Sequence, residues 1–176
     1  MSDDTESALL VPVPEAEPLV GGWRAKYDLA AQKGVPAHIT ILYPFVPPAE
    51  ITVETVDELA GFFSRFAPFD FVLTRTARFP QVVYLAPEPA EPFLRLTEAV
   101  HERWPSFPPY GGAFDEVVPH LTVVERDDGS DIDVLDIVER DIVRGVPIQA
   151  RAREVWLMQG DGSWSVRARF QLGVNG

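Results

Sequence analysis

The chain has 176 residues, 46% of them hydrophobic, and its 15 basic and 27 acidic residues give a formal net charge of −12. This length suits one compact unit, so we expect a single bilobed domain over residues 8–176 after a disordered N-terminus at residues 1–7. The acidic balance repels long nucleic acids at long range, so none is expected as a partner. A local pocket can still bind a small phosphorylated compound or an RNA terminus.

The composition also excludes several kinds of site. The chain contains no cysteine, which excludes disulfides, thiolate nucleophiles and Cys-ligated metals. No apolar run approaches the roughly 20 residues of a membrane-spanning helix, and the start Ser2–Glu6 lacks the basic region of a signal peptide. We therefore expect a cytoplasmic protein without a membrane partner. We also expect a monomer.

Hydrophobic periodicity, with the prolines that interrupt it, predicts the elements of the first half of the chain. They are a strand at 8–13, a helix at 19–27, a loop at 32–37, a strand from 38 to Pro44, a helix at 56–63, and a hairpin of strands at 69–77 and 82–86. Gly21 and Gly22 weaken the first helix by about 1 kcal/mol each relative to alanine. Pro68 is expected to stop the second helix.

The second half of the chain predicts helices and a long hairpin. Its elements are a helix at 91–104, a loop at 106–118, a strand at 118–123, a helix at 132–142, and a hairpin with arms at 148–158 and 164–172. Ser130 and Asp133 resemble a capping box for the later helix. No glycine fingerprint for nucleotide binding follows any strand. The mixed order predicts an α+β fold of mainly antiparallel sheet.

One four-residue pattern occurs twice, at His38–Ile41 and at His120–Val123. Each copy reads histidine, apolar, threonine, apolar, in surroundings typical of a short buried strand. Side chains alternate along a strand, so the histidine and threonine share one face while the apolar residues anchor the other. Copies 82 positions apart predict two pseudo-symmetric lobes with flanking helices around a central cleft.

Two imidazoles and two hydroxyls suit phosphodiester chemistry at a ribose. One imidazole can take a proton while the other gives one, on opposite sides of phosphorus. His38 and His120 would fill these roles without a metal or a cofactor. Thr40 and Thr122 can donate hydrogen bonds to the non-bridging phosphate oxygens, where charge grows in the transition state. The sequence does not settle which histidine is the acid and which the base.

The two copies resemble the paired His-x-Thr-x motifs of the two-histidine (2H) phosphoesterase superfamily, in the branch of RNA 2',5'-ligase-like proteins and cyclic phosphodiesterases. The similarity extends from Ala8 to Leu172. It implies a cleft between two lobes, cyclic phosphodiesterase or ligase activity on RNA-type 2',3'-linked phosphates, and a role in RNA processing. The active site that it implies consists of His38, Thr40, His120 and Thr122. Hydrolysis is the preferred direction, because an acidic surface disfavours holding two RNA ends for ligation.

Other interpretations of the motifs stay open. A lone histidine on an apolar strand is more often a core residue, and only the repeat argues against this for His38 and His120. A metal site on the two would need a third ligand such as Asp115 or Glu116, at a spacing that matches no known pattern. The competing function is a catalytically silent nucleotide-binding or protein-interaction module on the same fold.

Aromatic and basic residues near the motifs are further candidates. Tyr43, Tyr110 and Phe114 could stack on a base or nucleoside ring, although core or loop packing is the commoner role. The polar face of the final hairpin would carry a basic stripe formed by Arg151, Arg153, Arg167 and Arg169. This stripe could receive phosphate if it borders the cleft. We favour the alternative, a plain solvated sheet face.

Overall fold

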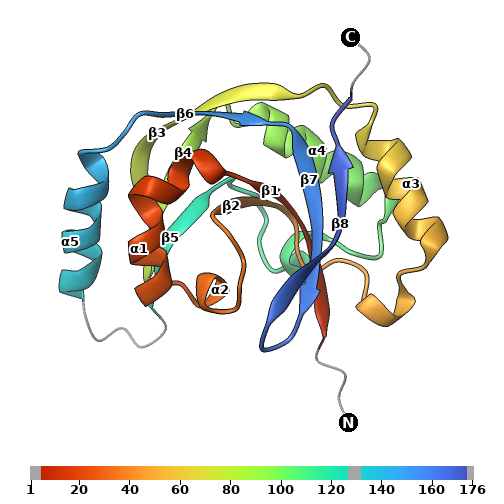
Figure 1. Ribbon diagram of the computed structural model, residues 1–176, viewed down its shortest axis with the longest axis horizontal. Helices are drawn as coiled ribbons and strands as arrows, with labels where there is room; N and C mark the ends of the chain where they lie inside the picture. The colour runs from red at the N-terminus through yellow and green to blue at the C-terminus, as the bar shows by residue number, and fades with distance from the viewer. Residues whose placement is uncertain (1–4, 127–131, 174–176) are drawn as a thin grey trace.

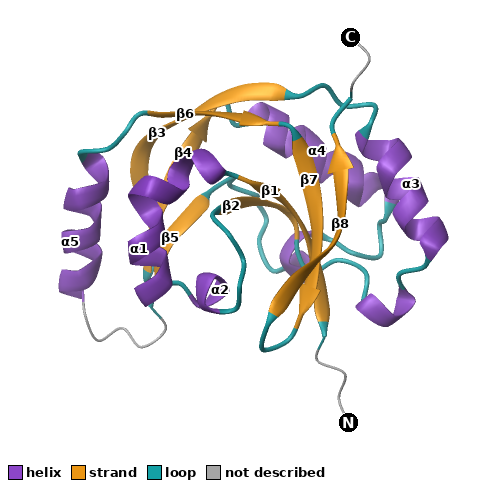
Figure 2. Cartoon of the chain, viewed as in Figure 1, coloured by secondary structure: helices purple, strands orange, loops and turns teal. Residues whose placement is uncertain are grey.

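The computed structural model describes residues 5–126 and 132–173, which form two four-stranded antiparallel sheets flanked by helices (Figure 1; Figure 2). The first sheet contains, in spatial order, β2 (His38–Leu42), β1 (Glu6–Pro12), β7 (Glu154–Gly160) and β8 (Trp164–Gln171). The second contains β5 (Leu121–Glu125), β4 (Val82–Glu88), β3 (Phe69–Phe79) and β6 (Ile148–Ala152).

Helices pack against both sheets. They are α1 (Glu17–Tyr27), α2 (Leu29–Gln32), α3 (Val53–Phe63), α4 (Glu91–Arg103) and α5 (Ile132–Val143). Helix α1 contacts β5 and α5 contacts β3 and β4, whereas α3 contacts β8 and α4 contacts β2. In Figure 1, α1 and α5 stand on one side of the molecule and α3 on the other. In the described part of the chain, no helix has both the length and the apolar character needed to cross a membrane.

The two halves of the chain repeat one plan. In each, a strand (β1 or β4) leads through a helix (α1 or α4) to a motif strand (β2 or β5), which pairs antiparallel with the first strand and forms one edge of its sheet. Each connecting helix packs across the motif strand of the other half, since α1 contacts β5 and α4 contacts β2. The predicted α+β fold with two pseudo-symmetric lobes is therefore confirmed.

Alternating burial explains why the motif strands sit where they do. Ile39 and Ile41 are buried in β2, and Leu121 and Val123 are buried in β5, so each strand turns its apolar side chains into the core. Thr97 of α4 is also buried, and its hydroxyl donates a hydrogen bond to the carbonyl of Ile41 (2.7 Å). The bond satisfies one edge carbonyl of β2 and ties helix to strand.

The prediction of one long hairpin arm at 148–158 is wrong. The arm is two strands, because β6 ends at Ala152 and β7 begins at Glu154 in the other sheet. Burial changes parity at this point, since Ala150 and Ala152 are buried before it and Val155 after it. One strand cannot turn even and odd positions to the same side, so the chain crosses between sheets at Arg153. The β7–β8 hairpin itself is confirmed, with Gly160 opposite Trp164.

Several boundaries also differ from the sequence prediction. Strand β1 starts at Glu6, inside the stretch that was expected to be disordered. Helix α3 ends at Phe63, so Pro68 lies beyond it. A 3₁₀ turn at Pro109–Gly112 occupies part of the expected loop, and the short α2 was not expected. The proposed capping box at Ser130 lies outside the described residues.

Candidate functional site

The first motif lies on β2 with the predicted alternation. His38 and Thr40 are half-buried and share one face, whereas Ile39 and Ile41 are buried on the other. His38 opens the strand, opposite Pro12 at the end of β1. The polar pair therefore projects from the sheet while the apolar pair anchors it.

The second motif differs in one detail. His120 was expected within a strand, but β5 begins one residue later, at Leu121. Pro119 precedes it and has no N–H to donate to a sheet. Thr122 is half-buried, and its neighbours Leu121 and Val123 are buried. Alternation thus holds from Leu121 onward.

The two histidines make the same hydrogen bond. His38 Nδ1 donates to the carbonyl oxygen of Pro36 (2.8 Å), and His120 Nδ1 donates to that of Val118 (2.7 Å). A carbonyl oxygen can only accept, so Nδ1 carries the hydrogen in both rings. In each neutral ring, Nε2 then has a free lone pair and can take a proton. Both imidazoles are thus oriented by a backbone carbonyl two residues before them.

One cavity joins the two motifs. It has a volume of about 720 Å³ and is lined by His38, Thr40, His120 and Thr122 together. We call this cavity the cleft. The motif strands β2 and β5 also contact one another. The structure therefore brings together the four side chains that the repeat singled out, although they come from two sheets.

The three aromatic candidates also line the cleft, although packing was the expected role for each. They are Tyr43, Tyr110 and Phe114. Tyr110 has φ 53° and ψ 33°, a left-handed conformation that is uncommon for a residue with a side chain. Its N–H donates to the carbonyl of Tyr43 (2.6 Å), and a hydrogen bond links its hydroxyl with that of Thr40. Phe114 is 66% exposed and meets Tyr110 edge-on at 5.7 Å.

Tyr43 is held by contacts of its own. Its hydroxyl donates a hydrogen bond to the carboxylate of Glu6, and its ring centroid lies 6.2 Å from that of Trp164. Burial, followed by the contact with Glu6, raises the pKa of Tyr43 to about 12. Tyr43 therefore stays protonated and acts as a hydrogen-bond donor and an aromatic wall.

Burial lowers the pKa of both motif histidines. For His38 it lowers the pKa to about 4, opposed by the hydrogen bond to Pro36 and assisted by the charges of Arg24 and His120. For His120 burial also lowers the pKa, and the hydrogen bond to Val118 opposes it. Both rings are thus neutral near pH 7.

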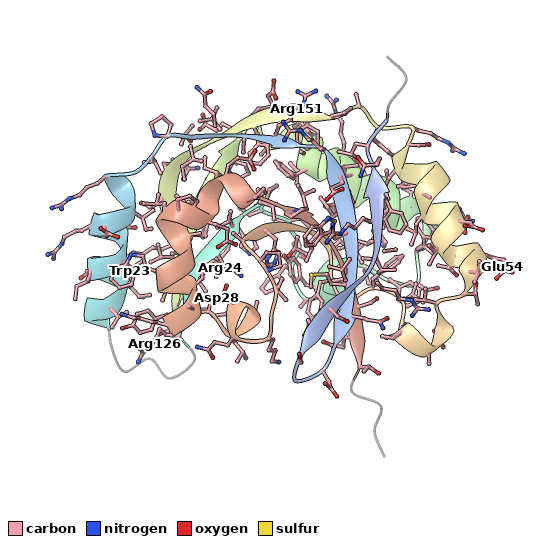
Figure 3. The ribbon with its side chains drawn as sticks, in the orientation of Figure 1. Trp23, Arg24, Asp28, Glu54, Arg126 and Arg151 are labelled. Carbon is pink, nitrogen blue, oxygen red and sulfur yellow. The ribbon has the colours of Figure 1, made fainter. Side chains whose placement is uncertain are left out.

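A buried ion pair lies beside the first motif. Arg24 and Asp28 are 2% and 1% exposed, and Arg24 Nε lies 3.0 Å from Asp28 Oδ2. Figure 3 shows both side chains where α1 runs into α2. Arg24 Nη2 donates to the carbonyl of Val35 (3.1 Å), and Asp28 Oδ1 accepts the N–H of Ala30 (3.1 Å). The pair thereby anchors the segment that leads into His38.

This ion pair was not predicted from the sequence, although a signal was present. Arg24 and Asp28 are four residues apart, the spacing of a helical ion pair. Asp28 lines the cleft, and burial raises its pKa while Arg24 opposes the rise. Lys33 and Trp164 also line the cleft. Nothing in the periodicity pointed to either one.

The predicted basic stripe is not one hairpin face, because Arg151 lies on β6 of the second sheet whereas Arg167 and Arg169 lie on β8 of the first. None of its four arginines is among the described residues that line the cleft. Arg151, which lies at the outer edge of the molecule in Figure 3, pairs with Asp70 (2.8 Å). Arg167 donates to the carbonyls of Pro48 and Ile51 (2.8 Å each). Arg151 and Arg167 therefore make contacts within the fold and away from the cleft.

Metal ligation is the alternative use of the two histidines. Within residues 5–126 and 132–173, no three histidine, aspartate or glutamate side chains are grouped so that they could hold one metal ion. The charged side chains that line the cleft are Asp28, Lys33, Glu116 and Glu125.

Comparisons with known proteins agree with this architecture. Residues 12–164 match the family model described as the 2'-5' RNA ligase superfamily. The protein TT0787 of Thermus thermophilus is similar at 22% identity and a TM-score of 0.63, covering 97% of this chain and 100% of that one. E. coli LigT complexed with 3'-AMP is similar at 16% identity and a TM-score of 0.59, covering 97% and 99%.

A second E. coli LigT structure, complexed with NADP+, is similar at 18% identity and a TM-score of 0.58, covering 98% of this chain and 99% of that one. At identities this low, the similarity to these structures shows a shared fold and nothing more. A search of curated protein sequences finds no match.

Proposed function

The chain belongs to the 2'-5' RNA ligase superfamily, and on that premise we propose that it is a metal-independent cyclic phosphodiesterase. Its substrates are small cyclic phosphates or RNA-terminal 2',3'-cyclic phosphates, hydrolysed by two-histidine acid/base catalysis. The observation that supports this best is the cleft of about 720 Å³ that both His-x-Thr motifs line. The proposal places the enzyme in the cytoplasm as a monomer.

In the proposed reaction, His38 is the base and His120 the acid. His38 Nε2 takes a proton from water as the water oxygen bonds to phosphorus. The bond from phosphorus to one ribose oxygen breaks, and His120, which enters the reaction protonated on both nitrogens, gives its Nε2 proton to that oxygen. Burial lowers the pKa of both histidines, and the charge of Arg24 lowers that of His38 further. This additional charge supports the assignment because it favours a neutral base on that side.

The threonines and the aromatic residues complete the proposed site. Thr40 and Thr122 donate hydrogen bonds to the non-bridging oxygens as their charge grows. The bond between the Tyr110 and Thr40 hydroxyls supports a fixed orientation for Thr40. Tyr43, Tyr110 and Phe114 offer faces and edges for the nucleoside.

The charge balance supports hydrolysis over ligation. Ligation would use the same ring-opening step, with an RNA 5'-hydroxyl in place of water as the nucleophile, and requires two RNA ends to be held together. A net charge of −12 disfavours holding two polyanions. Any 2',5' RNA ligase activity should therefore be slower than hydrolysis. The fold's likeness to E. coli LigT, which was solved with 3'-AMP, supports a ligand of nucleotide size.

The test is hydrolysis of nucleoside 2',3'-cyclic phosphates in the presence of a chelator. The parent should keep its activity, whereas His38→Ala and His120→Ala should each lose about 10³-fold, within the range of general acid–base catalysis. His101→Ala is the matched control, because His101 lies on α4 and outside the cleft. It should retain parent activity.

Each contrary outcome has a distinct meaning. Loss of activity with the chelator would overturn the metal-free mechanism. Equal activity in the parent and both motif variants would remove the site assignment. Nucleotide binding by calorimetry without any product would replace the enzyme with a catalytically silent binding module.

A further inference from the structure

A second cavity adjoins the cleft. It has a volume of about 320 Å³ and is lined by Glu6, Lys33, Tyr43, Gly160, Asp161, Gly162 and Trp164. We call it the side cavity. Three of these residues, Lys33, Tyr43 and Trp164, also line the cleft. The two cavities therefore share a wall.

The shared wall is held by backbone contacts. The N–H of Trp164, at the start of β8, donates to the carbonyl of Lys33 (2.7 Å), just beyond the end of α2. Gly34 has φ +99°, and a Cβ there would lie 3.1 Å from the carbonyl oxygen of Trp164. Only glycine fits this turn without strain. Lys33 and Trp164 are thus positioned together by the fold.

The acidic side chains near Lys33 already take part in an ion pair or accept a hydrogen bond from another group. Asp28 is paired with Arg24, Glu6 accepts from the Tyr43 hydroxyl, and Asp161 accepts the N–H of Gly162. Lys33 is the one lysine or arginine among the described residues that line either cavity. No ion pair joins its ammonium group to another described residue. Its charge is available to a ligand that spans both cavities.

The charge of the surroundings limits what that ligand can be. A phosphodiester carries one negative charge, which one lysine can neutralise as a point charge. Glu6 and Asp161 in the side cavity, with Glu116 and Glu125 in the cleft, oppose any group of higher charge. The arrangement therefore fits a diester linkage better than a polyphosphate.

We propose that the side cavity is the subsite for the nucleoside that precedes a cyclic-phosphate end, with the intervening phosphodiester on Lys33 and the preceding base against Trp164. The inference rests on the proposed function and names its substrate class, an RNA terminus of two or more nucleotides. A volume of about 320 Å³ is at the small end of the range of ligand pockets, about 300–1,000 Å³. It suits one nucleoside.

The test compares two substrates that differ by one nucleotide. Measure kcat/KM for adenosine 2',3'-cyclic phosphate and for uridylyl-adenosine ending in the same cyclic phosphate. The parent should prefer the dinucleotide by about tenfold, equivalent to about 1.4 kcal/mol. Lys33→Met should bring that ratio close to one. Lys26→Met is the matched control, because Lys26 is an exposed lysine of α1 outside both cavities, and it should keep the parent ratio.

The outcomes separate this inference from the proposed function. A parent that shows no preference for the dinucleotide overturns the subsite. So does a Lys33→Met variant that loses activity on both substrates in proportion. A parent that hydrolyses neither substrate overturns the proposed function instead. Calorimetry with 3'-AMP and with uridylyl-adenosine 3'-phosphate then decides the subsite, since only the longer ligand should bind more weakly to Lys33→Met.

Discussion

The two motif histidines make equivalent hydrogen bonds and line the same cleft, but their nearest charged and aromatic neighbours differ. Each Nδ1 is bound to the carbonyl two residues earlier. His38 lies near the buried cation of Arg24, whereas His120 is edge-on to two rings, Phe79 at 5.1 Å and Tyr84 at 5.5 Å. Local sequence therefore sets the tautomer of both rings. Packing from distant elements sets the charge that each ring can carry.

The different surroundings come from different parts of the fold. Arg24 belongs to α1, where its partner Asp28 and the carbonyl of Val35 hold it in place. Phe79 and Tyr84 come from the β3–β4 hairpin and stack on each other at 4.4 Å. A cation disfavours a second positive charge nearby, whereas aromatic edges and faces impose no such charge. The surroundings of His38 therefore favour the neutral ring that a base requires, whereas the rings around His120 add no positive charge that would oppose the protonated form of an acid.

Removing both histidines tests whether they work as one unit. Each single alanine variant should lose about 10³-fold in kcat, and the double variant His38→Ala/His120→Ala should lose no more than about tenfold beyond either single change. Groups that act in one step are strongly non-additive. Single-turnover hydrolysis of a cyclic nucleotide measures this. A double variant whose loss equals the product of the single losses would show that the rings act independently.

Breaking the ion pair tests the surroundings of His38. Arg24→Met leaves the buried carboxylate of Asp28 without its cation, and the free energy of unfolding should fall by about 3–5 kcal/mol. Arg78→Met is the control, because Arg78 and its partner Asp136 are both partly exposed (side-chain exposure 33% and 45%), and it should cost less than about 1 kcal/mol. Urea denaturation of the three proteins gives the values. Equal losses would show that the buried pair has no special role.

The pKa values of the two histidines also predict the pH dependence of kcat/KM. The base must be neutral, so activity should rise as pH increases through about 4, the pKa of His38. The acid must be protonated, so activity should fall as pH increases through the pKa of His120, which lies below its usual 6.5. The optimum should therefore lie between these values. A pH–rate profile with its maximum above pH 7 would contradict the assignment.

A charge-removing variant sharpens the same profile. Arg24→Met takes away a cation that lowers the pKa of His38. The rising limb should then move to higher pH while the falling limb stays in place, and the bell should narrow. Arg24→Lys keeps the charge and should keep the parent profile, even if it lowers stability. A shift of the falling limb alone would mean that Arg24 acts on His120.

The sequence was sufficient for the motif strands because alternation is a local property. The burial of Ile39, Ile41, Leu121 and Val123 follows from a period of two residues. The same alternation also predicts that the chain crosses from one sheet to the other at Arg153, because the buried positions have even numbers before this residue and odd numbers after it. The error there came from treating two apolar strands as one run.

The remaining features depend on contacts between distant elements. The cation near His38 comes from a helix residue 14 positions earlier, and the rings around His120 come from a hairpin. Tyr110 adopts a left-handed conformation that its sequence neighbours Pro109 and Gly111 allow but do not require. Such contacts follow from three-dimensional packing, on which a periodic pattern has no bearing.

The smallest predicted effect on kcat distinguishes the role of Thr40 from that of Thr122. Tyr110→Phe removes only the hydroxyl that is bound to Thr40, so kcat should fall by about 2- to 10-fold, the worth of one neutral hydrogen bond, while the fold stays intact. The change should have no further effect in a Thr40→Val background, because the bond is already lost there. In a Thr122→Val background it should keep its full effect, because Thr122 belongs to the other lobe. A double-mutant cycle on kcat measures both couplings. Equal coupling to the two threonines would mean that Tyr110 acts on the substrate and not through Thr40.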